Sequence, residues 1–282
     1  MSTQLDTFRR YVTANPVAAA APDRRVIMVG SGKGGVGTST VAALLGITAA
    51  ASGLEVLLVD ADERMGCLAW LLGVHPERTH ASLLGGGPTP EQLVARVGET
   101  LSLLPIGGTA IEPELTSGQR RALLRRVESI YARYDLVVVD AGSRLESIHT
   151  ICAYGPGRLL AVTGADRISV AATYALVKAV GTRFPATKLE VLVNRLDGTS
   201  SLATFAEIRT ATGEFLRSDV GFAGSVPDDE SLRAGVGAGM PVQEAAVGSP
   251  AAAACQQIGI RIGREVIESP APLVATRPSH WR

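Results

Sequence analysis

At 282 residues the chain is long enough for one large α/β domain, and its 27 acidic and 27 basic side chains give a formal net charge of zero. A neutral chain lacks the overall positive field that attracts nucleic acid, so we expect no nucleic-acid partner. No apolar run approaches the roughly 18 residues of a membrane span, and the N-terminus has no signal-peptide core. Cys67, Cys152 and Cys255 have no metal-ligand spacing, which favours a reducing compartment and a cytoplasmic protein.

The two ends of the chain are expected to lie outside the folded domain. Apolar residues at helical spacing predict a short amphipathic helix over residues 1–14, which Asn15-Pro16 ends. Residues 15–23 have the composition of an alanine- and proline-rich linker. Residues 268–282 contain three prolines, which interrupt any helix, and are expected to form a flexible tail.

Between these ends, short apolar runs alternate with longer amphipathic stretches over residues 24–267. Strands are expected over residues 26–29, 55–59, 101–104, 136–139, 159–162, 189–193 and 220–226. Helices are expected over residues 38–52, 66–73, 90–97, 117–133, 145–154, 168–183, 200–217, 229–235 and 251–267. Strands that are apolar on both faces and separated by helices imply a single α/β domain, with a mostly parallel sheet covered by helices on both faces.

A glycine-rich segment follows the first predicted strand and opens the first helix of this domain. In a phosphate-binding loop, glycines let backbone N–H groups curl around phosphate oxygens, a lysine reaches the β- and γ-phosphates, and a hydroxyl group binds Mg²⁺. The candidate nucleotide-binding residues here are Gly32, Lys33, Gly34, Gly35, Val36, Gly37, Thr38, Ser39 and Thr40. Thr38 replaces the lysine expected directly before Ser39. The strand, loop and helix in this order predict a P-loop NTPase fold with phosphate at a helix N-terminus.

Carboxylates follow two of the predicted strands. Asp60 and Asp62 come after the second strand, and Asp140 comes after the fourth. Because ligands of parallel sheets bind beyond the carboxyl ends of the strands, these side chains should collect beside the phosphate-binding loop. A carboxylate there can hold Mg²⁺ or orient an attacking water, although a single strand-end aspartate is also a common helix cap.

The loop, with its early lysine, paired glycines and following hydroxyl residues, resembles the deviant P-loop of the MinD/ParA ATPases. The resemblance implies ATP and Mg²⁺ as cofactors and a nucleotide-dependent homodimer, in which Lys33 of each chain reaches the partner's nucleotide. It also implies that Asp62 positions the attacking water, and that Ser39, Asp60 and Asp140 lie around Mg²⁺. Lys33 and Asp62 are therefore the candidate catalytic residues.

The same resemblance extends to the part of the site that would bind the base, and covers roughly residues 24–267. Asn194 and Arg195 resemble the family's Asn-Arg turn, which makes Asn194 the candidate for contacting the adenine edge. Pro227 and Asp228 resemble the loop that closes the other side of the base.

Three departures from the family pattern lie in the segments expected to bind and hydrolyse ATP. They are Thr38 in the P-loop, Cys67 in place of a switch I asparagine, and Ser143-Arg144 after the switch II glycine. A threonine hydroxyl has neither the charge nor the reach of an ammonium group. Losing such a contact costs about 1.5–3 kcal/mol, or roughly one to two decades in affinity, and more in the transition state. ATP hydrolysis should therefore suffer more than ATP binding. The sequence leaves enzymatic activity open, and a pseudo-ATPase acting as an interaction scaffold is an alternative.

Three further segments, residues 115–120, 174–178 and 249–251, resemble the flagellar-number regulators of the FlhG/FleN type. Those regulators carry an N-terminal helix that activates a flagellar signal-recognition-type GTPase, and the segment around Gln4 is similar to it. The resemblance implies a protein that regulates flagellar number or placement through this GTPase partner.

A basic cluster keeps a different function open. Arg120, Arg121, Arg125 and Arg126 are expected to form a solvated helix face, because runs of charge usually do. Bound to DNA, such a cluster would instead suit a ParA-type partitioning protein, or a Tad-type pilus-localisation protein.

The last predicted helix has a narrow apolar stripe of Ile258, Ile262 and Val266, which we expect to pack onto the sheet. The stripe lacks the broad apolar face and basic flank of a membrane-surface helix. Membrane binding is therefore expected to be weak or absent, with partners recruiting the protein to the membrane or the cell pole.

Overall fold

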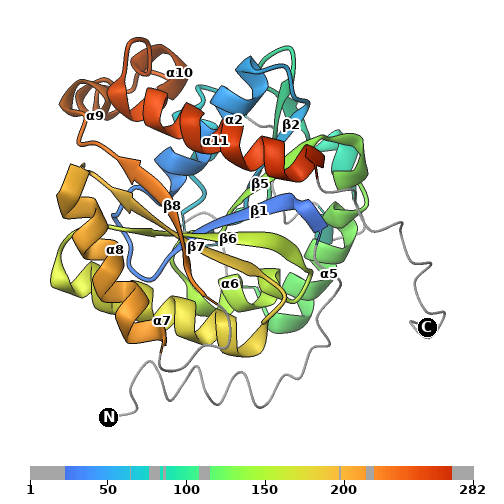
Figure 1. The fold of residues 1–282 in the computed structure, drawn as a ribbon. Coiled ribbons are helices and arrows are strands. Elements are labelled where there is room, and N and C mark those ends of the chain that lie inside the picture. Colours follow the sequence, from blue (N-terminus) through green and yellow to red (C-terminus); the bar gives the residue numbers. More distant parts are fainter. Residues whose placement is uncertain are drawn as a thin grey trace.

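Figure 1 shows the computed structural model, in which a twisted sheet lies between two layers of helices. The structure describes residues 23–63, 65–75, 83–84, 87–107, 115–196, 198–213 and 219–268. The strands in these ranges are β1 Asp23–Ser31, β2 Val56–Asp60, β3 Ala95–Arg96, β4 Leu101–Pro105, β5 Leu136–Asp140, β6 Pro156–Thr163, β7 Lys188–Asn194 and β8 Gly221–Val226.

The strands lie in the order β3-β4-β2-β5-β1-β6-β7-β8, so β1 is near the centre of the sheet between β5 and β6. Neighbouring strands from β4 to β8 are parallel, and the edge pair β3 and β4 is antiparallel. The register pairs Asp60 of β2 with Asp140 of β5, and Asp140 with Val29 of β1. The carboxyl ends of these three strands therefore meet at one place. The expected α/β fold with a mostly parallel sheet is confirmed.

The two layers of helices cover opposite faces of the sheet (Figure 1). On one face lie α2 Thr38–Ala51, α3 Leu68–Leu71, α9 Glu230–Gly237, α10 Val242–Ala245 and α11 Pro250–Glu268. On the other lie α5 Ser117–Glu128, α6 Leu145–Cys152, α7 Arg167–Arg183 and α8 Gly198–Gly213. The short 3₁₀ turns are η1 Pro90–Gln92 and η2 Tyr131–Arg133.

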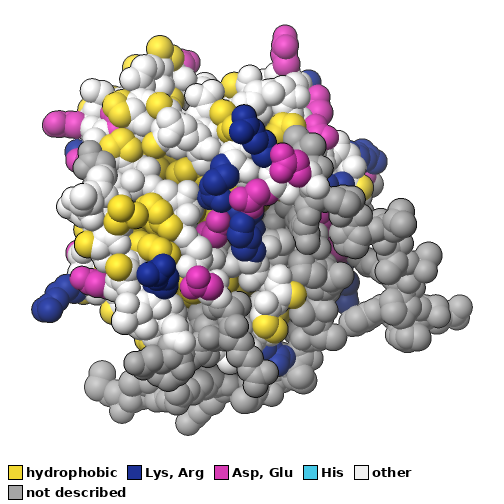
Figure 2. All heavy atoms as spheres, viewed as in Figure 1, with side chains coloured by type: hydrophobic (Ala, Val, Ile, Leu, Met, Phe, Trp, Pro, Cys, Tyr) yellow, Lys and Arg dark blue, Asp and Glu magenta, His cyan; other side chains and the backbone are white. Residues whose placement is uncertain are grey.

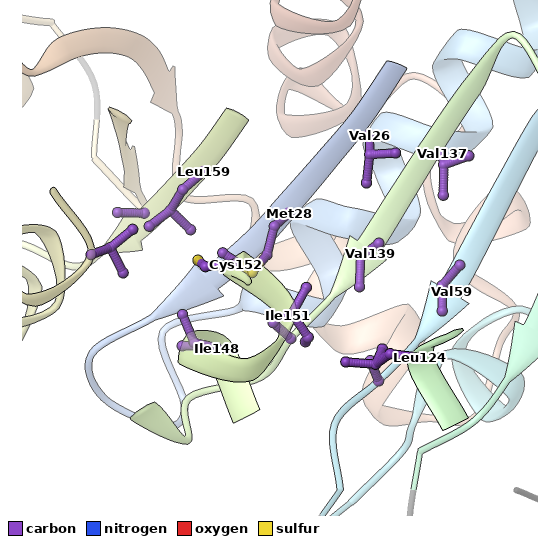
Figure 3. Close-up of a cluster of buried hydrophobic side chains, with 14 of the residues drawn as sticks. Val26, Met28, Val59, Leu124, Val137, Val139, Ile148, Ile151, Cys152 and Leu159 are labelled. Atoms are coloured by element: carbon purple, nitrogen blue, oxygen red, sulfur yellow. The ribbon is translucent and has the colours of Figure 1, made fainter. Parts of the chain in front are cut away.

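Alternation of side chains along each strand gives the sheet two separate cores. In the core shown in Figure 3, Met28 and Val139 pack with Leu124 of α5 and Ile148 of α6. The neighbouring residues Ile27 and Val138 point to the opposite face, where α2 and α11 cover them. Since apolar residues occupy both faces of each central strand, the sheet needs both helical layers.

Helix α2 lies close against the sheet because it is built from small residues. A Cβ atom on Gly46 would come within 2.8 Å of the Leu58 side chain on β2, so only glycine permits this approach. The helix begins after Gly37, whose φ of 89° is in the left-handed region that glycine adopts without strain. The glycine-rich loop therefore delivers the chain directly into a buried helix.

Helix α11 is fixed at both of its ends. Near its start, the Asp229 carboxylate accepts hydrogen bonds from the Leu232 N–H at 2.9 Å and the Ser249 hydroxyl at 2.6 Å. Toward its end, the helix joins an ion-pair network with the sheet, formed by Arg158, Lys188, Glu190, Arg261 and Glu265. Figure 2 shows basic and acidic side chains interleaved across the middle of this face.

The apolar stripe of this helix packs as the sequence predicts. Ile258 and Ile262 are buried in the core beneath α11, and Val266 packs against it. None of the helices within the described ranges is long and apolar enough to cross a membrane.

The helix predicted over residues 90–97 is wrong. The structure has only the turn η1, followed by Ala95 and Arg96, which pair with Leu103 and Ser102 of β4. Proline fits the first turn of a helix, and pairing with the edge of the sheet then satisfies the backbone better than a longer helix would.

Several predicted boundaries also differ. The helix predicted over 66–73 is limited to α3, the one over 117–133 breaks after Glu128, and α10 was not predicted. The expected N-terminal helix over 1–14, the linker apart from Asp23 of β1, and the tail after Glu268 lie outside the described residues. Residues 214–217 of the helix predicted over 200–217 also lie outside them.

Candidate functional site

The glycine-rich loop connects the carboxyl end of β1 to the N-terminus of α2. Gly35 and Gly37 both have positive φ angles, 83° and 89°, which turn the chain sharply before the helix. Gly32 lies against α7 so closely that a Cβ atom would fall 2.2 Å from the Ala172 carbonyl oxygen. Gly34 and Gly35 are exposed. The loop thus places backbone N–H groups next to the N-terminus of a 14-residue helix at a solvent-exposed position. This geometry attracts anions.

Thr38, at the position where a P-loop lysine is expected, is buried inside the loop. Its hydroxyl donates a hydrogen bond to the Ser31 hydroxyl at 2.9 Å, and Ser31 donates in turn to the Lys33 carbonyl at 3.0 Å. These two bonds tie the start of the helix to the end of β1. The side chain therefore supports the shape of the loop and supplies no charge to it.

Lys33 lies in an exposed ion pair with Asp166 at the N-terminus of α7. Its Nζ is 3.3 Å from Oδ1 and 3.5 Å from Oδ2 of that carboxylate. Hydrogen bonds from the hydroxyl and N–H of Ser169, together with Lys33, lower the pKa of Asp166 to about 2. Both charged side chains are about half exposed, at 40% and 54%, so water competes readily for this pair.

Asp60 and Asp140 lie side by side at the ends of β2 and β5, and both are buried. Burial raises the pKa of Asp60 well above its ordinary value, and the nearby Asp140 raises it further. Burial also raises the pKa of Asp140 to about 6, while Ser39 and the Gly142 N–H lower it. Such a pair of carboxylates favours either a proton or a cation between them.

The two carboxylates differ in the partners they already have. Asp60 accepts hydrogen bonds from the N–H groups of Leu68 at 2.8 Å and Asp62 at 3.3 Å. Asp140 accepts one from Gly142 at 3.0 Å, but its Oδ2 is buried with no hydrogen-bond partner. Asp140 Oδ2 and the Ser39 hydroxyl are therefore the oxygen donors that fit a hard cation such as Mg²⁺.

No group of three or more His, Cys, Asp or Glu residues in the described ranges could hold a metal ion by itself. Magnesium needs no such cage, because it keeps several waters and takes its other ligands from one or two protein groups and from phosphate. The residues present thus fit a cation that arrives with a phosphate ligand.

Asp62 lies against the loop that follows β5. A Cβ atom on Gly142, which has a φ of 62°, would fall 2.4 Å from Asp62 Oδ2. The carboxylate consequently lies next to the site of the orphaned Asp140 oxygen. This location suits its predicted role in orienting a water molecule, which stays a prediction.

Cys67 lies beside Ser39 at the same site. Burial raises the pKa of the Cys67 thiol to about 11, and the Ser39 hydroxyl opposes that shift. All three cysteines are free thiols. Arg144, the other departure, is the N-cap of α6, and its Nε is 3.5 Å from a carboxylate oxygen of Glu146 in that helix.

Asn194 braces the glycine-rich loop. Its side-chain Nδ2 donates to the Val36 carbonyl at 2.7 Å and lies where a Cβ atom on Gly37 would collide with it. Arg195, which follows it, has a φ of 60° and is exposed. The assignment of Asn194 and Arg195 to the adenine stays a prediction, and the geometry adds a bracing role for Asn194 that the sequence did not indicate.

Of the two residues predicted to close the other side of the base, Pro227 is half-buried and Asp228 is exposed. Asp228 pairs with Arg233. The neighbouring Asp229 is instead the buried cap that connects α9 and α11. The role of Pro227 and Asp228 toward a base therefore stays a prediction.

The basic cluster on α5 is not a uniformly solvated face, so that prediction is wrong for two of its members. Arg120 is buried and pairs with Glu63, which follows Asp62 directly. Arg126 donates to the carbonyl oxygens of Leu83 and Pro88. No local sequence signal identifies these contacts, because their partners lie far away in the chain.

The chain matches the CobQ/CobB/MinD/ParA nucleotide binding domain over residues 27–242. The antiactivator FleN of Pseudomonas aeruginosa is 28% identical to it, over 84% of this chain and 86% of that protein. The septum site-determining protein MinD of Thermotoga maritima is 26% identical, over 77% of this chain and 80% of that protein.

Solved structures have the same fold. The cell division ATPase MinD of Pyrococcus furiosus matches with a TM-score of 0.68 and 23% identity, covering 86% of this chain and 98% of that one. MinD of Pyrococcus horikoshii, complexed with Mg-ADP, matches with a TM-score of 0.70 and 22% identity, covering 87% and 99%.

Replacing Asp140 by Asn should stabilise the metal-free protein at pH 7.5. With a folded pKa of about 6 against an ordinary 3.8, the folded state binds more protons than the unfolded state between these values. The free energy of unfolding attributable to Asp140 therefore falls as pH rises through this window, by about 1–3 kcal/mol in all. Denaturant unfolding in EDTA, from pH 4 to pH 7.5, measures the effect.

The exposed Asp228→Asn variant is the matched control and should follow the wild type. The Asp140→Asn variant should lose less stability than the wild type as pH rises. Equal slopes in all three proteins would contradict the assigned cost of the buried charge.

Proposed function

The chain belongs to the CobQ/CobB/MinD/ParA nucleotide-binding domain family, and from this membership and the geometry of the site we propose that it is an ATP-binding regulatory switch. In this proposal ATP and Mg²⁺ favour a homodimer that recruits a partner protein, and hydrolysis is weak. The observation that carries it is the buried, unpartnered Asp140 Oδ2 beside Ser39, at the mouth of a glycine-rich loop.

Each part of the site has a task in ATP binding. The N–H groups of the loop and the N-terminus of α2 bind the phosphates. Ser39 and Asp140 hold Mg²⁺, which neutralises phosphate charge when it is bound. Asn194 keeps the loop in shape through its hydrogen bond to Val36.

Lys33 is held in the single chain by an exposed ion pair and is free to exchange it. In the proposed dimer, Lys33 leaves Asp166 and contacts the phosphates bound by the partner subunit. Asp62, next to Gly142, orients a water molecule toward the terminal phosphate. These two residues act on the transition state, where charge stabilisation counts most.

Weak hydrolysis follows from Thr38. Its hydroxyl is already bonded to Ser31, and no ammonium group stands at this position to balance the charge that develops on the phosphates. The same bond favours the alternative function, an interaction scaffold, because it lets the loop hold its shape without a ligand.

A finer proposal concerns the partner. Based on the resemblance to flagellar-number regulators, we propose that the segment around Gln4 contacts a flagellar signal-recognition-type GTPase. The similarity to the antiactivator FleN supports a regulatory role of this kind.

Thr38→Lys should tighten ATP binding by about 10- to 100-fold, and should raise ATP turnover by more, because it restores the missing charge. Isothermal titration with ATP and Mg²⁺, alongside a phosphate-release assay, measures both. Thr38→Ser keeps the hydroxyl group without adding charge and should match the wild type.

If the wild type binds no ATP at millimolar concentration while remaining folded, the switch proposal fails. If Thr38→Lys leaves turnover unchanged, Thr38 does not limit hydrolysis, and the native site is already competent.

Asp166→Asn should modestly increase the fraction of ATP-bound dimer, since water already competes for this exposed ion pair. Asparagine still caps α7 through its amide oxygen, and the change removes both the ion pair with Lys33 and the Ser169 hydroxyl bond to the second carboxylate oxygen. Lys33→Met should abolish the dimer but leave ATP binding to the monomer. Light-scattering mass measurements with ATP, ADP and no nucleotide test this, and a monomer in every state would contradict it.

Gln4→Ala should remove the activation of the GTPase partner without changing ATP affinity, because residue 4 precedes the residues that match the nucleotide-binding domain, 27–242. The measurement is the GTP turnover of a purified flagellar GTPase with and without this protein. Asp6→Ala, in the same segment, serves as the control. No activation by the wild type would exclude this partner.

A further inference from the structure

A buried ion pair fastens the chain just after Asp62 to the beginning of α5. The Arg120 guanidinium donates from Nε and Nη2 to the two carboxylate oxygens of Glu63. Nη2 also donates to the Leu115 carbonyl at 3.2 Å. The side chains of Arg120 and Glu63 are only 6% and 8% exposed. A two-point contact of this kind fixes both the position and the orientation of the carboxylate.

The Arg120–Glu63 pair lies one residue from the group expected to orient water. Consecutive Cα atoms are about 3.8 Å apart, so fixing Glu63 limits where the backbone of Asp62 can move. On its other side, Asp62 lies against Gly142. The segment 60–63 is therefore held between the loop after β5 and the start of α5.

Helix α5 also contacts the chain that follows Asp140. The Tyr154 hydroxyl, just beyond α6, donates to the Arg121 carbonyl at 2.9 Å. Adjacent residues of α5 thus contact Glu63, which directly follows Asp62, and Tyr154, which follows α6. These contacts fasten the start of α5 to the segment 60–63 and to the end of α6.

Stability alone does not account for such a pair. The cost of removing two charges from water offsets most of their attraction, and apolar side chains of similar size often stabilise a protein equally well. What the ion pair adds is a defined geometry. An exposed pair between the turns η1 and η2, Glu91 and Arg133 at 3.0 Å, has 36% and 64% exposed side chains and lacks this constraint.

We propose that Arg120 is a positioning residue, which holds Glu63 so that Asp62 stays in place to orient water. The inference rests on the proposed function for the role of Asp62. It assigns a task to a residue that acts through Glu63 and the backbone of Asp62.

The test uses the full chain with Trp281→Phe, which leaves Trp70 of α3 as the remaining tryptophan. The main variant combines Arg120→Met with Glu63→Leu, so that no buried charge is left unpaired. Arg120→Lys keeps the charge without the two-point contact. The matched control combines Arg133→Met with Glu91→Leu.

In the main variant, ATP turnover at saturating ATP and Mg²⁺ should fall about 10- to 100-fold, as expected when a reacting group is misplaced. ATP affinity should change by less than about threefold, because the phosphate-binding loop is untouched. Thermal unfolding should stay within a few degrees of the wild type. Arg120→Lys should recover part of the turnover, and the control should retain all of it.

A second readout needs no nucleotide. Amide hydrogen exchange should accelerate in the segment 60–63 of the main variant and stay unchanged in β5. Acrylamide quenching of Trp70 reports the neighbouring α3 in the same samples. Unchanged exchange in segment 60–63, or a loss of turnover that only follows a loss of thermal stability, would overturn the inference.

The two proposals fail in different ways. If the wild type binds no ATP, the proposed function fails, and exchange in the nucleotide-free chain then decides alone whether Arg120 holds the segment. If ATP binds and is turned over equally by all variants, only the positioning role fails.

Discussion

The repulsion between two buried carboxylates at neighbouring strand ends organises this site. Parallel strands lie about 4.8 Å apart, so the register that pairs Asp60 with Asp140 brings two acids together away from water. The fold accommodates the two buried carboxylates in two different ways. Backbone N–H groups surround Asp60, which fixes the start of α3, while Asp140 keeps one oxygen without a partner. Asp60 thus fixes the local backbone, whereas Asp140 supplies the oxygen that the proposed function assigns to a cation.

The glycine-rich loop next to these acids keeps its shape without the lysine that usually stands in it. Thr38 ties the loop to the end of β1, and Asn194 ties it to the end of β7. Neither contact requires a bound anion. Loop geometry and loop charge are therefore separable here, so the chain keeps the fold of nucleotide-binding proteins without the loop lysine.

The fold was largely readable from the sequence, because buried strands of a parallel sheet are apolar on both faces and the helices between them are amphipathic. The helix predicted over 90–97 was wrong because pairing with β4 outweighs local preference. At the site, the strand-end aspartates and the glycines could be located by pattern. The pairing of Arg120 with Glu63 and the bond from Asn194 to Val36 could not, since both depend on contacts between distant segments.

Because α11 is attached to the rest of the fold at both ends, the helix can transmit force along its axis. Its 19 residues span about 28 Å, from the Asp229 cap beside the loop 227–228 to the ion pairs with β6 and β7. A pulling force applied near Glu268 would act first on the ion pairs of α11 with β6 and β7, which form an ionic anchor. It would act next on the hydrogen bonds of Asp229 at the start of the helix. Salt screens the half-exposed members of the ionic anchor, Lys188, Arg261 and Glu265, but screens the buried Arg158–Glu190 pair much less, so this attachment to the sheet persists at high ionic strength.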